Sequence, residues 1–181
     1  NPLTACSVAS QVHVLSKPRR LQLILKEDLI WYPVDSNITN TIPFDGGSDE
    51  HHCSKHFKSL ITNSYELCVT GGALIALANK YGDQINNINF DHQVPPSYIM
   101  KSLVINVLVF ARTAPVQKER ILTTLKTNGY TTLMCGDGTN DVGALKQADV
   151  GISIINSIEM DQMAEKVSNA AKYNNKNKKN K

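Results

Sequence analysis

The clearest indication of the fold is the stretch Met134-Cys135-Gly136-Asp137-Gly138-Thr139-Asn140-Asp141-Val142-Gly143-Ala144-Leu145. Apolar residues before the loop predict a strand over 131–135, and the residues after it predict a helix over 140–147. In an open α/β sheet, ligands bind beyond the carboxyl ends of the strands. The loop between this strand and this helix is therefore expected to lie at a ligand-binding edge.

Two carboxylates in the loop indicate a cation site. Asp137 follows the strand between Gly136 and Gly138, which allow a tight turn and a close approach of the backbone to a bound group. Asp141 comes four residues later, in the first turn of the helix, and two carboxylates facing one crevice repel each other unless a cation lies between them. Mg²⁺ suits this arrangement, because it takes one or two carboxylates together with waters and phosphate oxygens. The alternative is a plain Asp/Asn/Gly turn before a capped helix, which the flanking strand and helix make less favoured.

Regular elements continue on both sides of this loop. Towards the carboxyl end, a strand is predicted over 150–155. Upstream, we expect a strand over 107–110 and a helix that begins at Pro115 and ends at Gly129. Strands that alternate with helices in this way predict an α/β fold, a Rossmann-like parallel sheet with crossover helices.

The first half of the chain is less regular. Helices are predicted over 3–10 and 73–80, and strands over 21–25, 29–32 and 67–70. Polar stretches over 36–64 and 82–97 are expected to form loops or insertions. We therefore expect a folded body over 1–170, with an insertion over about 36–64, and a disordered Asn/Lys-rich tail over 171–181.

Composition fits a globular protein and bears on its partners. Hydrophobic residues make up 41% and charged residues 19% of the 181 residues, which suits one domain. Five lysines and no acidic residue lie within 172–181, and without them the net charge falls from +3 to −2, so nucleic acid is not expected as a partner. The apolar stretches are too short to span a bilayer, and four cysteines without a CxxC pair suit reduced thiols in a cytosolic setting.

Lys118 is a candidate phosphate ligand. It falls in the first turn of the helix that begins at Pro115, where the helix dipole favours anions. An ammonium group there is a point-charge ligand for a phosphoryl group. A lone lysine at a helix start is usually only solvated, and it is the spacing from Lys118 to Asp137 that favours the functional interpretation.

Other candidate sites have plainer explanations. His51-His52-Cys53 with His56 lacks a fourth ligand at finger-like spacing and is interpreted as part of a polar surface insertion. Cys135 has no histidine beside it and is expected to be a small core residue. The pair Trp31-Tyr32 is expected to pack at a strand edge.

Three segments resemble a known family. Residues 136–153, GDGTNDVGALKQADVGIS, resemble the hinge and magnesium motif of P-type ATPases, which belong to the haloacid-dehalogenase-like superfamily. Residues 110–118, FARTAPVQK, look like their FAR..P..K segment. Residues 1–6, NPLTAC, look like the residues that directly follow their TGD motif. The resemblance covers roughly residues 1–32 and 65–155, in the same order as in the family.

This resemblance implies a catalytic role for each matching position. Asp137 would coordinate Mg²⁺, and Asp141 with Asn140 would hold the water shell of the metal and the loop. Lys118 would bind the transferred phosphoryl group, and Arg112 would face ATP bound at the neighbouring nucleotide-binding domain. The chain would then be the carboxyl-terminal part of the phosphorylation domain, with an incomplete haloacid-dehalogenase-like sheet.

Details favour the fifth class of P-type ATPases, in its endoplasmic-reticulum branch of transmembrane-helix dislocases. VGALKQA over 142–148, NPLTAC and the CVTG over 68–71 resemble that branch. Gly72 departs from the charged or polar residue expected there, and residues 36–58 look like a lineage-specific insertion. The resemblance implies a cytosolic domain of an integral membrane protein of the endoplasmic reticulum, with the rest of the ATPase chain and its membrane helices as partners.

The chain contains no DKTGT, the motif that carries the phosphorylated aspartate of the family. Phosphoryl transfer needs a positioned nucleophile as well as charge stabilisation, so this chain alone is expected to be inactive. One alternative is a free-standing phosphatase of the same superfamily, which would need a DxD nucleophile motif near its amino terminus. The other is a non-catalytic fragment or paralogue that acts through protein contacts.

Overall fold

The computed structural model describes most of the chain up to Ile154. The described residues are 1–15, 21–46, 55–62, 65–83, 85, 95–137 and 139–154. The predicted tail over 171–181, the cluster His51-His52-Cys53 and the site residue Gly138 lie outside them.

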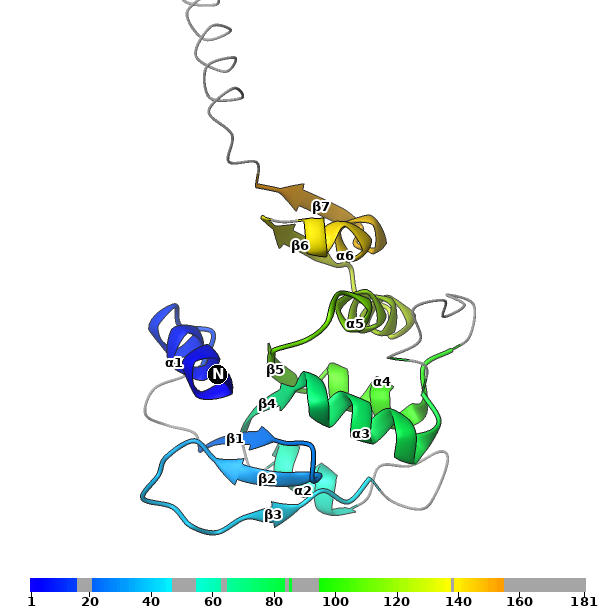
Figure 1. Cartoon of the computed structure of the whole chain (residues 1–181). Coiled ribbons are helices and arrows are strands. Elements are labelled where there is room, and N and C mark those ends of the chain that lie inside the picture. The colour runs from blue at the N-terminus through cyan, green and yellow to red at the C-terminus, as the bar shows by residue number, and fades with distance from the viewer. Residues whose placement is uncertain are drawn as a thin grey trace, which may run out of the picture.

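A five-stranded sheet forms the centre of the larger part of the molecule, with strand order β3-β2-β1-β4-β5 (Figure 1). Its strands are β1 (Gln22–Leu25), β2 (Ile30–Pro33), β3 (Ile42–Pro43), β4 (Glu66–Thr70) and β5 (Val107–Ala111). β4 pairs in parallel with both β1 and β5, whereas β1, β2 and β3 form an antiparallel meander. Every residue of β4 is buried, as expected for a parallel strand covered on both faces.

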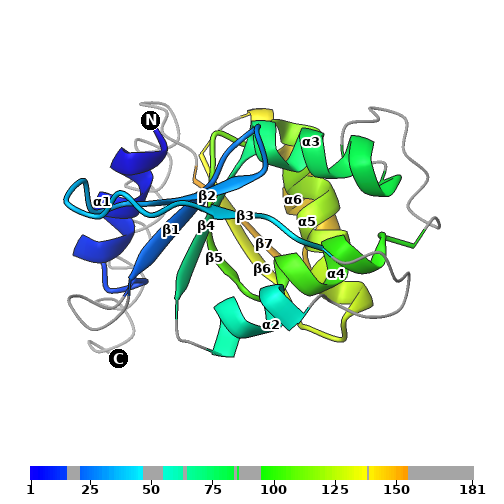
Figure 2. The same ribbon diagram turned by 90° about the horizontal axis from the view of Figure 1, so that it is seen from below.

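Helices cover both faces of this sheet (Figure 2). α1 (Pro2–Gln11) packs on one face, over a small buried cluster that includes Cys6, Cys68 and Val109. The other face carries α3 (Gly71–Tyr81), α4 (Tyr98–Val104) and α5 (Pro115–Thr127), and α2 (Lys55–Thr62) packs beside β3. The main core lies beneath these helices, and Trp31 is buried in it against Phe44, with a ring-centroid distance of 6.2 Å.

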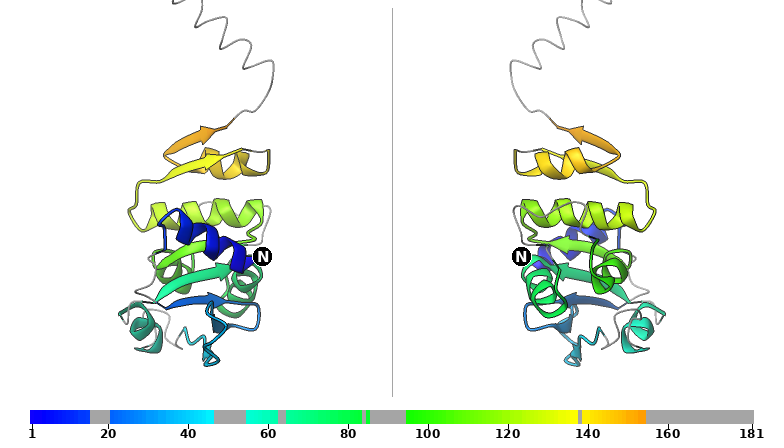
Figure 3. Two further views of the ribbon diagram at one scale, coloured as in Figure 1. Left: turned by 90° about the vertical axis from the view of Figure 1, so that its left-hand side faces the viewer. Right: turned by 90° about the vertical axis from the view of Figure 1, so that its right-hand side faces the viewer.

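A second sheet carries the loop that the sequence analysis singled out. It consists of β6 (Leu133–Gly136) and β7 (Val150–Ser153), which are parallel. A 3₁₀ turn η1 (Thr139–Asp141) and the helix α6 (Val142–Gln147) connect the two strands. Within the described residues β6 has no hydrogen-bonded pairing with β5, and α5 lies between the two sheets in Figures 1 and 3.

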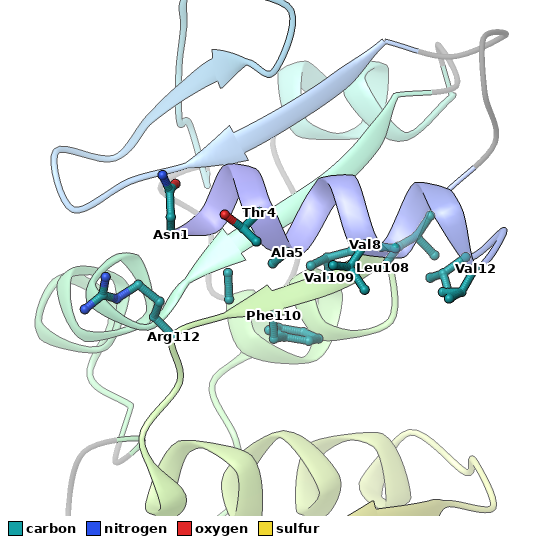
Figure 4. Close-up of a pocket in the computed structure, with 12 residues that line it drawn as sticks. Asn1, Thr4, Ala5, Val8, Val12, Leu108, Val109, Phe110 and Arg112 are labelled. Atoms are coloured by element: carbon teal, nitrogen blue, oxygen red, sulfur yellow. The ribbon is translucent and has the colours of Figure 1, made fainter.

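The outer edge of β5 borders an open groove. α1 and β5 line it, and its volume is about 610 Å³. Val8 and Leu108 face this groove, with exposed fractions of 52% and 48% (Figure 4). Asn1 and Arg112 lie at the same end of it, near the carboxyl end of β5. The five-stranded sheet therefore ends in an apolar edge that nothing in the described residues covers.

The predicted α/β class and the order of its elements are confirmed, with shifts of a few residues at the ends. Three elements were missed. β3 and α2 lie within the polar stretch over 36–64, which was expected to form loops or insertions, and α4 lies directly before β5. Two side-chain predictions were wrong. Cys135 is exposed, since β6 lies in a small two-stranded sheet with an open face. Trp31 is fully buried, because β2 lies between β1 and β3 and not at a sheet edge.

Candidate metal and phosphate site

The candidate site is built on the connection from β6 to α6. Asp137 directly follows β6 and is exposed to solvent. Asp141 ends the 3₁₀ turn as the N-cap residue of α6 and is only 8% exposed. Asn140, beside it, is exposed. The loop therefore offers one solvent-facing carboxylate and one buried carboxylate within five residues of chain.

Gly136 is required by the position of Asp141. A Cβ atom at residue 136 would lie 2.7 Å from the Cβ of Asp141 and 2.9 Å from its Oδ2. No side chain fits in that space without displacing the carboxylate. The sequence analysis assigned this glycine to a tight turn, and the structure adds that it makes room for Asp141.

Lys118 meets the loop from the neighbouring helix. Its Nζ lies 2.7 Å from Oδ1 of Asp141, and the side chains are 34% and 11% exposed. A charge-assisted hydrogen bond of this length is stronger than one between neutral groups. The structure thus brings together Lys118, Asp141 and Gly136, which the sequence analysis had placed in one site from spacing and resemblance.

The start of α5 is fixed by its own sequence. Pro115 occupies the first helical turn, where its missing N–H is not needed. The side chain of Gln117 folds back, and its Oε1 accepts a hydrogen bond of 2.9 Å from the N–H of Ala114. These contacts place Lys118 in the first turn of the helix, as predicted.

Arg112 directly follows β5, at the carboxyl end of this strand of the five-stranded sheet. Its side chain is exposed, and its φ of 56° is unusual for a residue other than glycine. The backbone here packs closely against the start of α3, because a Cβ on Gly71 would lie 2.3 Å from the carbonyl oxygen of Arg112. The structure therefore holds the backbone of Arg112 firmly and leaves its guanidinium free to meet another molecule or domain.

The donor set fits Mg²⁺. No group of three or more His, Cys, Asp or Glu side chains gathers at a possible metal position in the described part of the chain. Mg²⁺ does not need such a group, since it binds through one or two carboxylates and takes its other ligands from water and phosphate. Asp137 and Asp141 are the two carboxylates that this loop offers, and Gly136 makes room for the side chain of Asp141.

A polar cluster at the far end of β6 fastens the two-stranded sheet. Asp149 accepts hydrogen bonds from the N–H and hydroxyl of Thr132, at 2.8 and 3.0 Å. Lys126 of α5 lies 3.1 Å from the same carboxylate. These hydrogen bonds, and then the positive charge of Lys126, lower the pKa of Asp149. The cluster ties β6 and the start of β7 to α5, the helix that carries Lys118.

The sequence analysis missed two contacts near the site. Gln117 was noted only as part of a helix, although glutamine at the third position of a helix is a recognised capping signal. Glu119 packs against α6, and a Cβ on Gly143 would lie 1.7 Å from its Oε1. Spacing along the chain gives no signal for this second contact.

Within the described residues, no helix is long and apolar enough to cross a membrane. No protein-family model matches the chain.

Curated relatives match nearly all of it. The endoplasmic reticulum transmembrane helix translocase of Schizosaccharomyces pombe is 40% identical over 166 residues, which cover 90% of this chain and 12% of the relative. The protein of the same name in Saccharomyces cerevisiae is 40% identical over 163 residues, 88% of this chain and 11% of the relative. A probable manganese-transporting ATPase of Arabidopsis thaliana is 39% identical over 160 residues, 86% and 11% of the two chains. This chain thus matches only 11–12% of the length of these relatives.

Proposed function

The chain belongs to the P-type ATPase family, and from that premise we propose that it is the Mg²⁺- and phosphate-binding part of the catalytic domain of an ATP-driven membrane translocase. One observation carries the proposal. Lys118 and Asp141, 23 residues apart, form a 2.7 Å ion pair, and Asp141 lies in the same loop as Asp137, four residues further along the chain. Such a site suits a phosphoryl group, which needs both a cationic ligand and a metal position.

In this proposal the side chains divide the binding of metal and phosphate between them. Asp137 and Asp141 hold Mg²⁺, which when bound neutralises negative charge on the phosphoryl oxygens. Lys118 donates hydrogen bonds to the same phosphoryl group, and Asp141 holds the ammonium in place before that group arrives. Asn140 supports the water shell of the metal, and Gly136 and Gly138 let the backbone approach. Arg112 reaches towards ATP held by a separate nucleotide-binding domain.

The phosphorylated aspartate would come from elsewhere in the complete protein. This chain has no DKTGT, and its relatives are far longer. We propose that strands from the remaining sequence complete the sheet between β5 and β6, where both edges lack a partner strand in the described residues. The groove beside Leu108 would receive one of them. The chain alone would then hydrolyse no phosphomonoester.

The location follows from the named relatives. Two of them are named as endoplasmic reticulum translocases, and we propose that this chain is a cytosol-facing part of a protein in that membrane. The transported substrate would be selected by membrane helices outside this chain.

The test is ATP hydrolysis by the complete protein with Asp137→Asn. Turnover is expected to disappear, because the amide removes the charge that holds Mg²⁺. Asp149→Asn is the matched control, since Asp149 lies at the opposite end of β6 and should leave turnover unchanged. Normal turnover in Asp137→Asn would refute the metal assignment.

A further inference from the structure

Gln117 is a buried amide directly beside Lys118. Its exposed fraction is 1%. Its Nε2 donates a hydrogen bond of 3.0 Å to the carbonyl oxygen of Gly71, and its Oε1 accepts the bond from the N–H of Ala114. A single side chain thus joins the start of α5 to the start of α3, which lies 46 residues earlier in the sequence.

We propose that Gln117 is a positioning residue, whose amide sets the place of Lys118 relative to the carboxyl edge of the five-stranded sheet. The inference rests on the proposed function, in which Lys118 is a phosphoryl ligand. It goes further because it assigns a role to a residue that touches neither metal nor phosphate.

The residues around Gln117 are closely packed. A Cβ on Gly71 would lie 2.3 Å from the carbonyl oxygen of Arg112 and 2.8 Å from Oε1 of Gln117. The β4–α3 junction, the end of β5 and the start of α5 therefore meet around this one amide. Thr70 caps α3 at the same junction, since its Oγ1 accepts a hydrogen bond of 3.1 Å from the N–H of Ala73.

Only an amide makes both contacts of Gln117. The Gly71 carbonyl needs a donor and the Ala114 N–H needs an acceptor, and glutamine carries both on one planar group. Methionine has similar length but supplies neither, and it would leave the buried carbonyl of Gly71 without this partner. Lys118 would then be held by Asp141 alone, and its ammonium would shift relative to the other sheet.

The effect should appear in the rate of the chemical step. A displacement of about 1 Å in a catalytic group can lower a rate about 100-fold. We therefore expect Gln117→Met to lower kcat of the complete protein by roughly 10- to 100-fold. The KM for ATP should change less than about twofold, since Gln117 does not contact the nucleotide.

The matched control is Thr124→Val on the same helix. Thr124 lies six residues beyond Lys118 and is fully buried, and its Oγ1 donates a hydrogen bond of 2.7 Å to the carbonyl of Arg120. This variant also removes a buried hydrogen bond from α5, and it should lower the unfolding temperature without lowering kcat. All rates are to be measured below the unfolding temperature of each variant.

A second readout does not depend on turnover. Lysines of this chain can be methylated with ¹³C, and the Lys118 resonance can be followed by NMR. In Gln117→Met that resonance should move towards the position of exposed lysines, whereas in Thr124→Val it should stay in place.

The outcomes separate this inference from the proposed function. A kcat within twofold of wild type in Gln117→Met, equal losses in the two variants, or an unmoved Lys118 resonance would each overturn the positioning role. Normal turnover in Lys118→Met would instead refute the proposed function.

Discussion

Lys118 Nζ and Asp141 Oδ1 lie 2.7 Å apart and join α5 to the start of α6. Lys118 lies in the first turn of α5, which follows β5, and Asp141 caps α6, which follows β6. The pair is thus a direct polar link between α5 and the loop after β6, in addition to the ion pair of Lys126 with Asp149. Because both side chains are partly buried, removing either charge would leave the other without its compensating partner.

Lys118→Met should destabilise this chain, because it leaves the carboxylate of Asp141 buried without its cation. Since Lys118 is one-third exposed, solvent screening reduces the loss to about 1 kcal/mol, or about 2–4 °C in unfolding temperature. Lys146→Met, a change of the same charge at an exposed position on α6, is the control. Thermal unfolding at low salt provides the measurement, and equal unfolding temperatures for the two variants would contradict a role of the ion pair.

Gly136→Ala should displace Asp141, because the new Cβ would lie 2.7 Å from the Cβ of that residue. Overpacking of this kind costs about 1–3 kcal/mol, and we expect Mg²⁺ binding to weaken along with stability. Gly82→Ala is the matched control. Gly82 has a φ of 71° and open space around its Cα, so alanine there strains the backbone without touching the site. If both variants lose stability but bind Mg²⁺ equally well, Gly136 does not support the metal position.

Much of this fold could be predicted from apolar periodicity, because strands such as β4 and helices such as α5 carry continuous patterns. α2 was missed because its buried residues, Phe57 and Leu60, are too few to stand out in a polar stretch. The separation into two sheets could not be predicted, because pairing between distant strands leaves no local pattern. The same holds for the exposure of Cys135, which depends on what covers the face of β6.

The candidate site also has a part that could be predicted from the sequence and a part that could not. Asp137, Asp141 and Lys118 were predicted as site residues from a motif and its spacing. The structure places Lys118 and Asp141 in contact, and their role in binding stays a prediction. The contact of Gln117 with Gly71 could not be predicted, because the two residues are 46 positions apart. Capping the start of α5 would by itself explain a glutamine at this position.

The stability of the two-stranded sheet should depend on pH through Asp149. Its pKa is lowered in the folded chain, first by the hydrogen bond from the Thr132 N–H, whereas in the unfolded chain it is about 3.9. The carboxylate therefore contributes its full stabilisation above about pH 4, and the contribution is lost as the pH falls through the lower, folded-state pKa. Urea unfolding midpoints between neutral pH and about pH 3 should fall less in Asp149→Asn than in wild type. The same pH dependence in both proteins would contradict this role of Asp149.

The thiols should differ sharply in reactivity. Cys6 and Cys68 are 0% and 2% exposed, and their mutual hydrogen bond, together with burial, raises the pKa of Cys68. Cys135 is exposed, so a maleimide should label it first in a Cys53→Ser background. Cys6 and Cys68 should react only when the chain unfolds, which mass spectrometry of tryptic peptides can follow. Labelling of Cys6 or Cys68 at the rate of Cys135 would contradict the packing of α1 on the sheet.

The central claim is that the loop after β6 holds Mg²⁺ through Asp137. The most direct measurement is a titration of this chain with Mg²⁺, followed by the amide resonances of Gly136, Asp137, Asn140 and Asp141. Saturable shifts confined to this loop are expected in the wild type, and they should be lost in Asp137→Asn but kept in Asp149→Asn. Shifts of the same size and midpoint in Asp137→Asn, or none in the wild type, would contradict the account.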